Sequence, residues 1–281
     1  MAEEDGPLLE FKNVSLRFGQ ITALKNISLA LKPGETRILF GAAGSGKTSL
    51  LKAVIGLIPV DEGEIRLFGQ EVTSKEEHDL YALRSRTGVL FQEGGLFDSL
   101  TIGENVEYPL LNRQTGDEEQ ENISKEQAEK RVRDALCFVE LEHTINQFPS
   151  EVSGGMRRRV GIARAIVTEP PLVLYDSPTA GLDPITANTI MALIAKERET
   201  RNSASLIVTH RYQDGELMAN FRYNADREGL EPTGASAEHG RSDGRTKFIV
   251  MKEGEIVFFG TREELESSGD EYVKKFVRKE G

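Results

Sequence analysis

Residues 36–48 read Thr36-Arg37-Ile38-Leu39-Phe40-Gly41-Ala42-Ala43-Gly44-Ser45-Gly46-Lys47-Thr48, and this stretch decides the fold. Its first five positions are mostly apolar or β-branched, as in a buried strand. The next eight match the pattern GxxxxGKT, and an apolar helical periodicity continues through Leu50, Leu51, Val54 and Ile55. A strand, a glycine-rich loop and a helix in this order predict an α/β protein with a phosphate-binding loop.

The chemistry of this loop suits a nucleotide. Its glycines allow backbone N–H groups to curl around phosphate oxygens, and the helix N-terminus adds partial positive charge. Lys47 can reach the β- and γ-phosphates, and the Thr48 hydroxyl can ligate Mg²⁺. A glycine-rich turn without a ligand is the alternative, but the complete motif favours a nucleotide site. Its predicted residues are Gly41, Ala42, Ala43, Gly44, Ser45, Gly46, Lys47, Thr48 and Ser49.

A second stretch is predicted to deliver an acid to the same region. Leu172-Val173-Leu174-Tyr175 is an apolar run that stops at Asp176, and a turn rich in Pro and Gly follows. A carboxylate at the carboxyl end of a buried strand is well placed to hold a hard cation. Asp183 and Pro184 then occupy the cap and first positions of a predicted helix.

Three other predicted strands lead to candidate site residues. Phe18 ends an alternating pattern over 8–18, Gln92 ends a strand from 87, and His210 follows a strand over 205–209. Phe18 is either a core aromatic or a platform for an adenine base. Gln92 is either an ordinary strand-end residue or part of a cation shell. A lone His is more often structural, but strand ends carrying Lys47, Gln92 and Asp176 favour phosphate sensing by His210.

Residues 95–168 are more charged and have a helical pattern. Ser124 and Gln127 form a capping box, and Ser153 is the expected N-cap of a helix that begins Gly154-Gly155-Met156. Taken alone, Ser153-Gly154-Gly155 is only a cap. Residues 114–122 are expected to form a solvated acidic loop. The second helix carries basic residues that we expect on a solvated or ion-paired face: Arg157, Arg158, Arg159 and Arg164.

The last quarter of the chain is uneven in pattern. Near the start of the chain, residues 8–18 and 27–31 alternate apolar and polar positions as half-buried antiparallel strands do, and in the last quarter a hairpin is predicted over 247–260. Between them, residues 222–246 have few apolar positions and no period, so we expect a flexible insertion without regular structure. The tail places Tyr272, Val273, Phe276 and Val277 on one helical face, which needs something to pack on.

Composition excludes several classes of protein. With 35 Lys+Arg against 46 Asp+Glu, the formal charge of −11 argues against nucleic-acid binding. Cys137 is the single cysteine, which excludes an intrachain disulfide; we expect a buried thiol and a reducing cytosol. No apolar stretch approaches the roughly 20 residues that span a bilayer, and the acidic first residues are unlike a signal peptide. Any membrane role is expected to come through a partner.

The order of these motifs resembles the ATP-binding subunit of ABC transporters. Six motifs follow one another as in that family: the phosphate loop, Gln92, Ser153-Gly154-Gly155, Asp176, the Ala180-Gly181-Leu182-Asp183 turn and His210. The resemblance implies a RecA-like phosphate-loop core with an antiparallel β subdomain and an inserted α-helical subdomain at about 95–168. It implies one ABC ATPase domain over 7–265 and a tail, 266–281, that packs on a partner subunit.

The resemblance also implies the mode of action. Two copies form a head-to-tail homodimer, in which each ATP lies between the phosphate loop of one subunit and Ser153-Gly154-Gly155 of the other. Thr48, Gln92 and Asp176 would hold Mg²⁺, with Asp183 near the nucleotide. Membrane-spanning permease subunits would dock near Gln92 and the helical lobe. The protein would then be peripheral, on the cytoplasmic face of the inner membrane.

A finer resemblance concerns the transported substrate. Three segments are similar to the ATPases of Mla/Mce-type systems. They are Phe91-Gln92-Glu93-Gly94-Gly95-Leu96-Phe97-Asp98-Ser99-Leu100-Thr101, the basic helix at 156–160 and the tail at 270–276. These systems move phospholipids or other lipids between bacterial membranes, which implies a lipid-binding periplasmic subunit and a small auxiliary subunit as further partners. A lipoprotein-release or amino-acid-uptake ATPase is the nearest alternative.

Two departures from the family pattern affect catalysis. A Glu normally follows the position of Asp176, but this chain has Ser177, and a Ser cannot act as a carboxylate base. Losing general-base help of about 10²–10⁴-fold costs roughly 3–5 kcal/mol of barrier. Arg211 stands where many members have an acid. The chain is therefore either an active transport ATPase, catalysing with Lys47, Asp176, Ser177, His210 and Gln92, or an ATP-driven dimerisation switch with little hydrolysis. A soluble ABC protein of DNA repair or translation is a third option, which the acidic charge disfavours.

Overall fold

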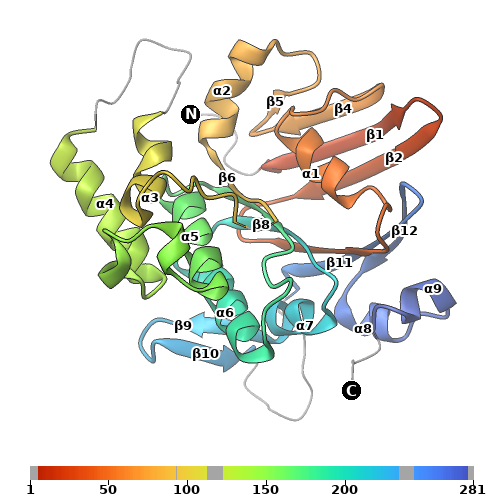
Figure 1. Cartoon of the computed structure of the whole chain (residues 1–281). Helices are drawn as coiled ribbons and strands as arrows, with labels where there is room; N and C mark the ends of the chain where they lie inside the picture. Colours follow the sequence, from red (N-terminus) through yellow and green to blue (C-terminus); the bar gives the residue numbers. More distant parts are fainter. Residues whose placement is uncertain (1–5, 93, 113–122, 234–243, 278–281) are drawn as a thin grey trace.

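The computed structural model describes residues 6–92, 94–112, 123–233 and 244–277. A six-stranded sheet forms its centre, in the order β12-β11-β3-β8-β7-β6 (Figure 1). The strands from β11 to β6 are parallel, and β12 is the antiparallel edge strand that completes the hairpin predicted over 247–260. Their bounds are β3 (Thr36–Gly41), β6 (Thr87–Leu90), β7 (Leu172–Asp176), β8 (Ala204–Val208), β11 (Thr246–Lys252) and β12 (Glu255–Gly260).

An antiparallel sheet and one helix cover the first face of this central sheet. Its strand order is β2-β1-β4-β5, and helix α1 (Lys47–Val54) shares a core with both sheets. The antiparallel strands predicted over 8–18 and 27–31 are confirmed, and they pair with each other, since Leu9 lies opposite Leu31 and Phe11 opposite Leu29. The remaining bounds are β1 (Leu9–Phe18), β2 (Ile21–Leu31), β4 (Glu62–Leu67), β5 (Gln70–Glu71) and α2 (Glu77–Ser85).

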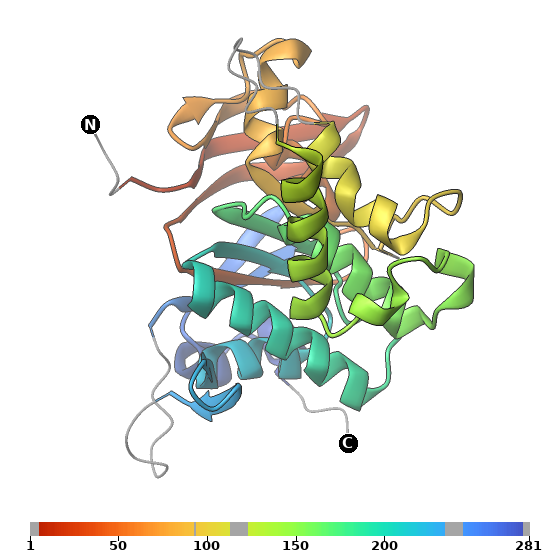
Figure 2. The same ribbon diagram turned by 90° about the vertical axis from the view of Figure 1, so that its left-hand side faces the viewer.

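Helices cover the second face, and Figure 2 shows α6, in teal, running beneath the sheet. Strands β3, β7 and β8 are buried along their whole length, as expected for strands covered on both faces. The capping box of Ser124 and Gln127 and the N-cap at Ser153 are confirmed. The helices are α3 (Ile102–Leu111), α4 (Lys125–Phe138), η1 (Glu142–Thr144), η2 (Pro149–Glu151), α5 (Gly154–Ile166), α6 (Pro184–Arg201), α7 (Tyr212–Asn220), α8 (Arg262–Glu266) and α9 (Glu271–Lys274).

Two surface expectations need correction. The arginines of α5 donate to main-chain carbonyls, so a solvated face is wrong for Arg158, which is buried and bonds Ala180 O at 3.3 Å. Arg164 likewise donates to Gly94 O at 2.8 Å. Cys137, expected to be buried, is exposed on α4. A helical period shows that one face is buried but not how far a long side chain reaches into a neighbouring loop. The acidic loop expected at 114–122 lies outside the described residues.

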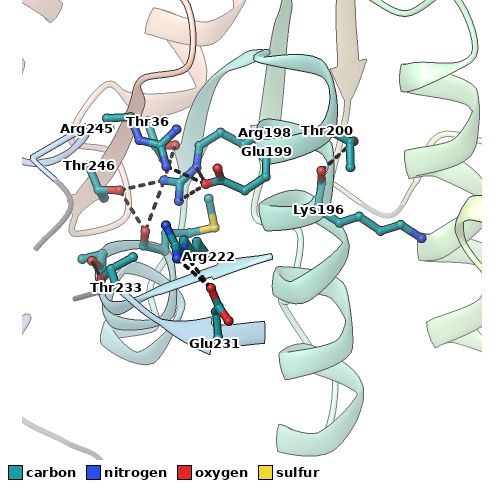
Figure 3. A network of polar contacts seen from close by, with 12 residues as sticks. Thr36, Lys196, Arg198, Glu199, Thr200, Arg222, Glu231, Thr233, Arg245 and Thr246 are labelled. Atoms are coloured by element: carbon teal, nitrogen blue, oxygen red, sulfur yellow. Dashed lines mark hydrogen bonds and ion pairs between the residues drawn. The ribbon is translucent and has the colours of Figure 1, made fainter. Parts of the chain in front are cut away.

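The expectation of no regular structure over 222–246 is wrong for its first part. Strands β9 (Phe221–Asn224) and β10 (Gly229–Pro232) form an antiparallel hairpin that packs on α6. Figure 3 shows an ion pair between Arg222 and Glu231 across the hairpin, at 2.8 Å. Nearby, the fully buried Arg198 of α6 donates to Thr36 Oγ1 and Thr246 Oγ1 at 3.4 and 3.0 Å. These bonds fasten α6 to the first residues of β3 and β11, at the edge of the sheet opposite the phosphate loop.

The tail also packs differently from the expectation. Its apolar face is predicted to need something to pack on, for which the resemblance implies a partner subunit. Val273 is instead buried in this chain's own core, and Phe276 stacks on Phe40 with ring centroids 6.1 Å apart. The hydroxyl of Tyr272 donates to Met251 O at 3.1 Å. The predicted apolar face of the tail is present, and the surface that covers it lies on β3 and β11 of the same chain.

One buried acid on α6 makes stability depend on pH. Glu197 is fully buried, and burial raises its pKa from 4.5 to about 7, although Arg201 opposes the shift from 3.3 Å. Between pH 4.5 and 7 the folded chain keeps a proton that the unfolded chain has released, so stability falls as pH rises through this window.

We therefore expect Glu197→Gln to lose this pH dependence. Because one pKa unit is worth about 1.4 kcal/mol, its stability relative to wild type should rise by about 2–3 kcal/mol between pH 5 and pH 8. Urea unfolding at both pH values measures the difference. The exposed Glu129→Gln on α4 is the matched control. Parallel pH profiles for wild type and Glu197→Gln would contradict the prediction.

Candidate nucleotide site

The carboxyl ends of four parallel strands meet at one edge of the central sheet. Lys47 follows β3 through the phosphate loop, Asp176 ends β7, His210 follows β8, and Gln92 follows β6. Register brings them to the same level, since Asp176 pairs with Val208, and Tyr175 pairs with Leu90. This edge is where ligands bind in open α/β sheets, and all four strand-end predictions fall on it.

The phosphate loop depends on its glycines for shape. Gly46 is the N-cap of α1 with φ 102°, and a Cβ there would lie 2.2 Å from Ala23 O. No side-chain acceptor caps α1 at this position, so its first N–H groups are available to an anion. The same close approach brings β2, and with it the tip of the β1–β2 hairpin, beside the loop.

Phe18 lies at that hairpin tip. It pairs with Ile21, and about half of its surface is exposed (49 %). The core-aromatic alternative is therefore excluded. An exposed aromatic ring beside a phosphate loop is available to stack on a base.

Lys47 is the buried cation of the site. Its Nζ donates to Gly41 O and Ala42 O, both at 2.8 Å, and to Ser45 Oγ at 3.3 Å. Burial lowers the pKa of Lys47, and the charge of Asp176 partly opposes this shift. The ammonium thus bonds to neutral loop oxygens. A phosphate oxygen would take their place and form a stronger, charge-assisted hydrogen bond.

Asp176 accepts hydrogen bonds from two hydroxyl groups of the site. Its Oδ2 accepts from Thr48 Oγ1 at 3.4 Å and its Oδ1 from Ser177 Oγ at 3.2 Å. Within the described ranges, no three His, Cys, Asp or Glu side chains cluster as metal ligands. One carboxylate and one hydroxyl fit Mg²⁺, which in such sites takes its other ligands from water and substrate phosphates.

His210 lies near enough to Lys47 and Asp176 for their charges to act on it. Partial burial lowers the pKa of His210, the charge of Lys47 lowers it further, and Asp176 raises it. These influences put the imidazole within electrostatic reach of both groups. Gln92 is exposed, two residues beyond the end of β6.

In the described part of the chain, no hydrogen bond joins the phosphate loop to Ser153, Gly154 or Gly155. Ser153 Oγ accepts from Met156 N at 3.2 Å, and a Cβ on Gly155 would lie 2.8 Å from Thr186. Asp183 caps α6, since its Oδ1 accepts from Ile185 N and Thr186 N, both at 3.0 Å. The Thr186 hydroxyl also donates to Asp183 Oδ2 at 2.6 Å, and this bond, followed by the backbone bonds, lowers the pKa of Asp183.

Residues that sequence reasoning missed complete the site. Ala42 N donates to the Tyr272 hydroxyl at 3.2 Å, so the tail reaches the phosphate loop. Thr179 and Thr209 both donate to Asp214 on α7. The bonds of Tyr272 to Ala42 and of Thr179 to Asp214 join segments far apart in the sequence, so no local pattern marks them.

The fold and site define a phosphate-loop ATPase whose sheet, β subdomain and helices match known cassettes. A family model described as ABC transporter matches residues 24–180, and the chain belongs to the ABC transporter family. It is 30% identical to the intermembrane phospholipid transport ATP-binding protein MlaF of Haemophilus influenzae, over 97% of this chain and 91% of that one. It is 35% identical to the methionine import ATP-binding protein MetN of Corynebacterium efficiens, over 84% of this chain and 63% of that one.

Solved structures agree with this assignment. A dimeric ATP-binding cassette in a post-hydrolysis state, bound to ADP and Pi, superposes with a TM-score of 0.72. It is 31% identical in sequence and covers 90% of this chain and 98% of that one. The protein is thus an ABC transporter ATPase subunit that binds ATP. Among the described residues, no helix has the length and apolar character needed to cross a membrane.

Proposed function

We propose that this chain is the ATP-hydrolysing subunit of a transporter that moves phospholipid or another lipid between membranes. The supporting observation is the extent of its similarity to MlaF, which runs over 97% of the chain. The similarity to MetN is higher in identity but covers 84% of the chain and less than two thirds of MetN. Lipid transport is therefore favoured over amino-acid uptake.

We further propose that two copies act as a head-to-tail dimer. Ser153 caps α5 and is exposed, so the N-terminus of that helix is free to face a phosphate on another subunit. Thr48, Asp176 and Gln92 would hold Mg²⁺, which supplies charge neutralisation at the β- and γ-phosphates. Phe18 would stack on the adenine. One ABC ATPase domain over 7–265 remains our proposal for the domain boundaries.

A surface cavity supports docking of a permease. It has a volume of about 410 Å³ and lies between α2, β6, α3 and α5, with Tyr81, Tyr108 and Arg164 in its lining. Burial lowers the pKa of Arg164, and its guanidinium lies over the ring of Phe97. Exposed aromatic rings around a buried cation suit a short amphipathic helix from a membrane-spanning partner. Such docking would hold the subunit on the cytoplasmic face of the inner membrane.

We expect Tyr81→Glu and Tyr108→Glu to weaken permease binding by at least about 10-fold, because each places a charge at the rim of an apolar contact. Affinity for ATP should stay unchanged, since neither residue contacts the phosphate loop. Co-purification with the permease and nucleotide titration measure the two effects. Val257→Glu, on the exposed side of β12, is the control. Normal co-purification of both Tyr variants would refute this docking site.

The transported substrate is tested in the assembled complex. With the permease in phosphatidylethanolamine and phosphatidylglycerol vesicles, ATP should drive transfer of a fluorescent phospholipid, and methionine should not stimulate ATPase. ATP-driven methionine uptake without lipid transfer would overturn the lipid assignment and leave the ATPase assignment intact.

A second function is favoured by one observation, the position of Ser177. Its hydroxyl bonds to Asp176 Oδ1 at 3.2 Å, where the family has a carboxylate base. A chain that binds ATP and dimerises but hydrolyses slowly would act as a switch on its partner. Phosphate release by the assembled complex at the level of a Lys47→Ala control would favour the switch over the transport ATPase.

A further inference from the structure

A buried carboxylate joins the two loops that flank the reaction centre. Asp214 Oδ2, on α7, accepts a hydrogen bond from Thr179 Oγ1 at 2.5 Å and another from Thr209 Oγ1 at 2.6 Å. All three residues are buried, each with 1 % of its surface exposed. Thr179 lies two residues after Ser177, and Thr209 directly precedes His210.

Arg211, which stands where many family members have an acid, is also part of this cluster. Its guanidinium lies 3.5 Å from Asp214 Oδ1, and its backbone N–H donates to Thr209 Oγ1 at 3.1 Å. Thr209 thus accepts from one loop residue and donates to the acid, which fixes the orientation of its hydroxyl. Because burial of a carboxylate is costly without partners, two hydroxyl donors and a cation indicate a specific arrangement.

A backbone hydrogen bond also connects the two segments that Asp214 joins. Ser177 adopts a left-handed φ of 54°, and its backbone N–H donates to Val208 O at 2.9 Å. The short side chain of Ser177 reaches Asp176 but no farther. A lateral shift of the turn after Ser177 relative to His210 is opposed by the bonds from Thr179 and Thr209 to one carboxylate oxygen, together with the Ser177 N–H bond to Val208 O and the Arg158 bond to Ala180 O.

We propose that Asp214 is a positioning residue for ATP hydrolysis, which holds the Ser177 turn and His210 in one geometry through Thr179 and Thr209. Asp214 itself does not touch the nucleotide, so it governs the rate of the chemical step rather than the affinity for ATP. The inference rests on the ATPase assignment and is independent of the transported substrate.

Isosteric variants separate the hydrogen bonds from packing. Thr179→Val and Thr209→Val remove one hydroxyl each, and kcat of the assembled complex should fall roughly 10- to 100-fold, as misplaced catalytic groups do. The Kd for ATP should stay within about twofold, because uniform binding is untouched. Thr179→Ser and Thr209→Ser restore the hydroxyl and should recover most of the rate. Thr144→Val, which removes another buried hydroxyl in the helical lobe, is the control.

A double-mutant cycle tests the shared acceptor. In an Asp214→Asn background, Thr179→Val should cost much less than in wild type, because the strong acceptor is already lost. Equal losses in both backgrounds, or equal losses for the Ser and Val variants, would overturn the proposal. So would a fall in ATP affinity parallel to the fall in kcat.

A readout without hydrolysis keeps the proposal testable if wild-type turnover is slow. The chain has four histidines, and His210→Gln identifies the His210 signal in ¹³C-histidine NMR spectra. Thr209→Val should let the imidazole move relative to Lys47 and Asp176, so its ring signals should shift from their wild-type positions. Unchanged His210 signals in both Val variants, together with unchanged kcat where turnover is measurable, would refute the positioning role.

Discussion

Ser177→Glu should raise the rate of ATP hydrolysis roughly 10²-fold, since a positioned general base contributes about 10²–10⁴-fold. Ser177 is buried beside Asp176, and its hydroxyl donates to that carboxylate rather than accepting a proton from water. Steady-state phosphate release by the complex with its permease measures the effect.

Ser177→Gln is the matched control, because it has the length of Glu without a basic carboxylate. We expect its rate to stay near that of wild type. A rate within twofold of wild type for Ser177→Glu would mean that proton removal is not rate-limiting. The switch function would then lose its chemical basis, and Lys47, Mg²⁺ and His210 would suffice for turnover.

Lys47→Ala should lower hydrolysis by roughly 10²–10³-fold or more, the cost of removing a preorganised donor to developing charge. The ammonium is buried and held by the carbonyls of Gly41 and Ala42, so it is already aimed into the loop. Removing it leaves these carbonyls without their cation and the phosphates without a direct counter-charge. The ATPase rate and nucleotide affinity, measured together, separate the chemical loss from the binding loss.

Lys52→Ala tests whether the effect is local, because Lys52 lies in the last turn of the same helix, away from the loop. Its rate should match that of wild type. If Lys47→Ala kept more than about a tenth of the wild-type rate, the phosphate loop would not be the centre of the chemistry.

Local signals account for the predictions that the structure confirms. The backbone at Gly46 has a φ of 102°, which glycine adopts readily, so a glycine at this position can be predicted from the local loop motif. The caps at Ser153 and Asp183 are equally local, since each side chain bonds to N–H groups two or three residues ahead. These short-range rules place the helices and strands, and parallel strand order then brings their ends together.

The sequence by itself determined the phosphate loop, the strand that carries Asp176 and the caps, because each depends on neighbours within one turn. Only the tertiary structure decided where Tyr272 and Phe276 pack, how 221–232 folds, and which hydroxyls reach Asp214. Thr179 and Asp214 are 35 positions apart, and Ala42 and Tyr272 are 230 apart. Contacts at such separations depend on how whole layers pack, and no local periodicity encodes that packing.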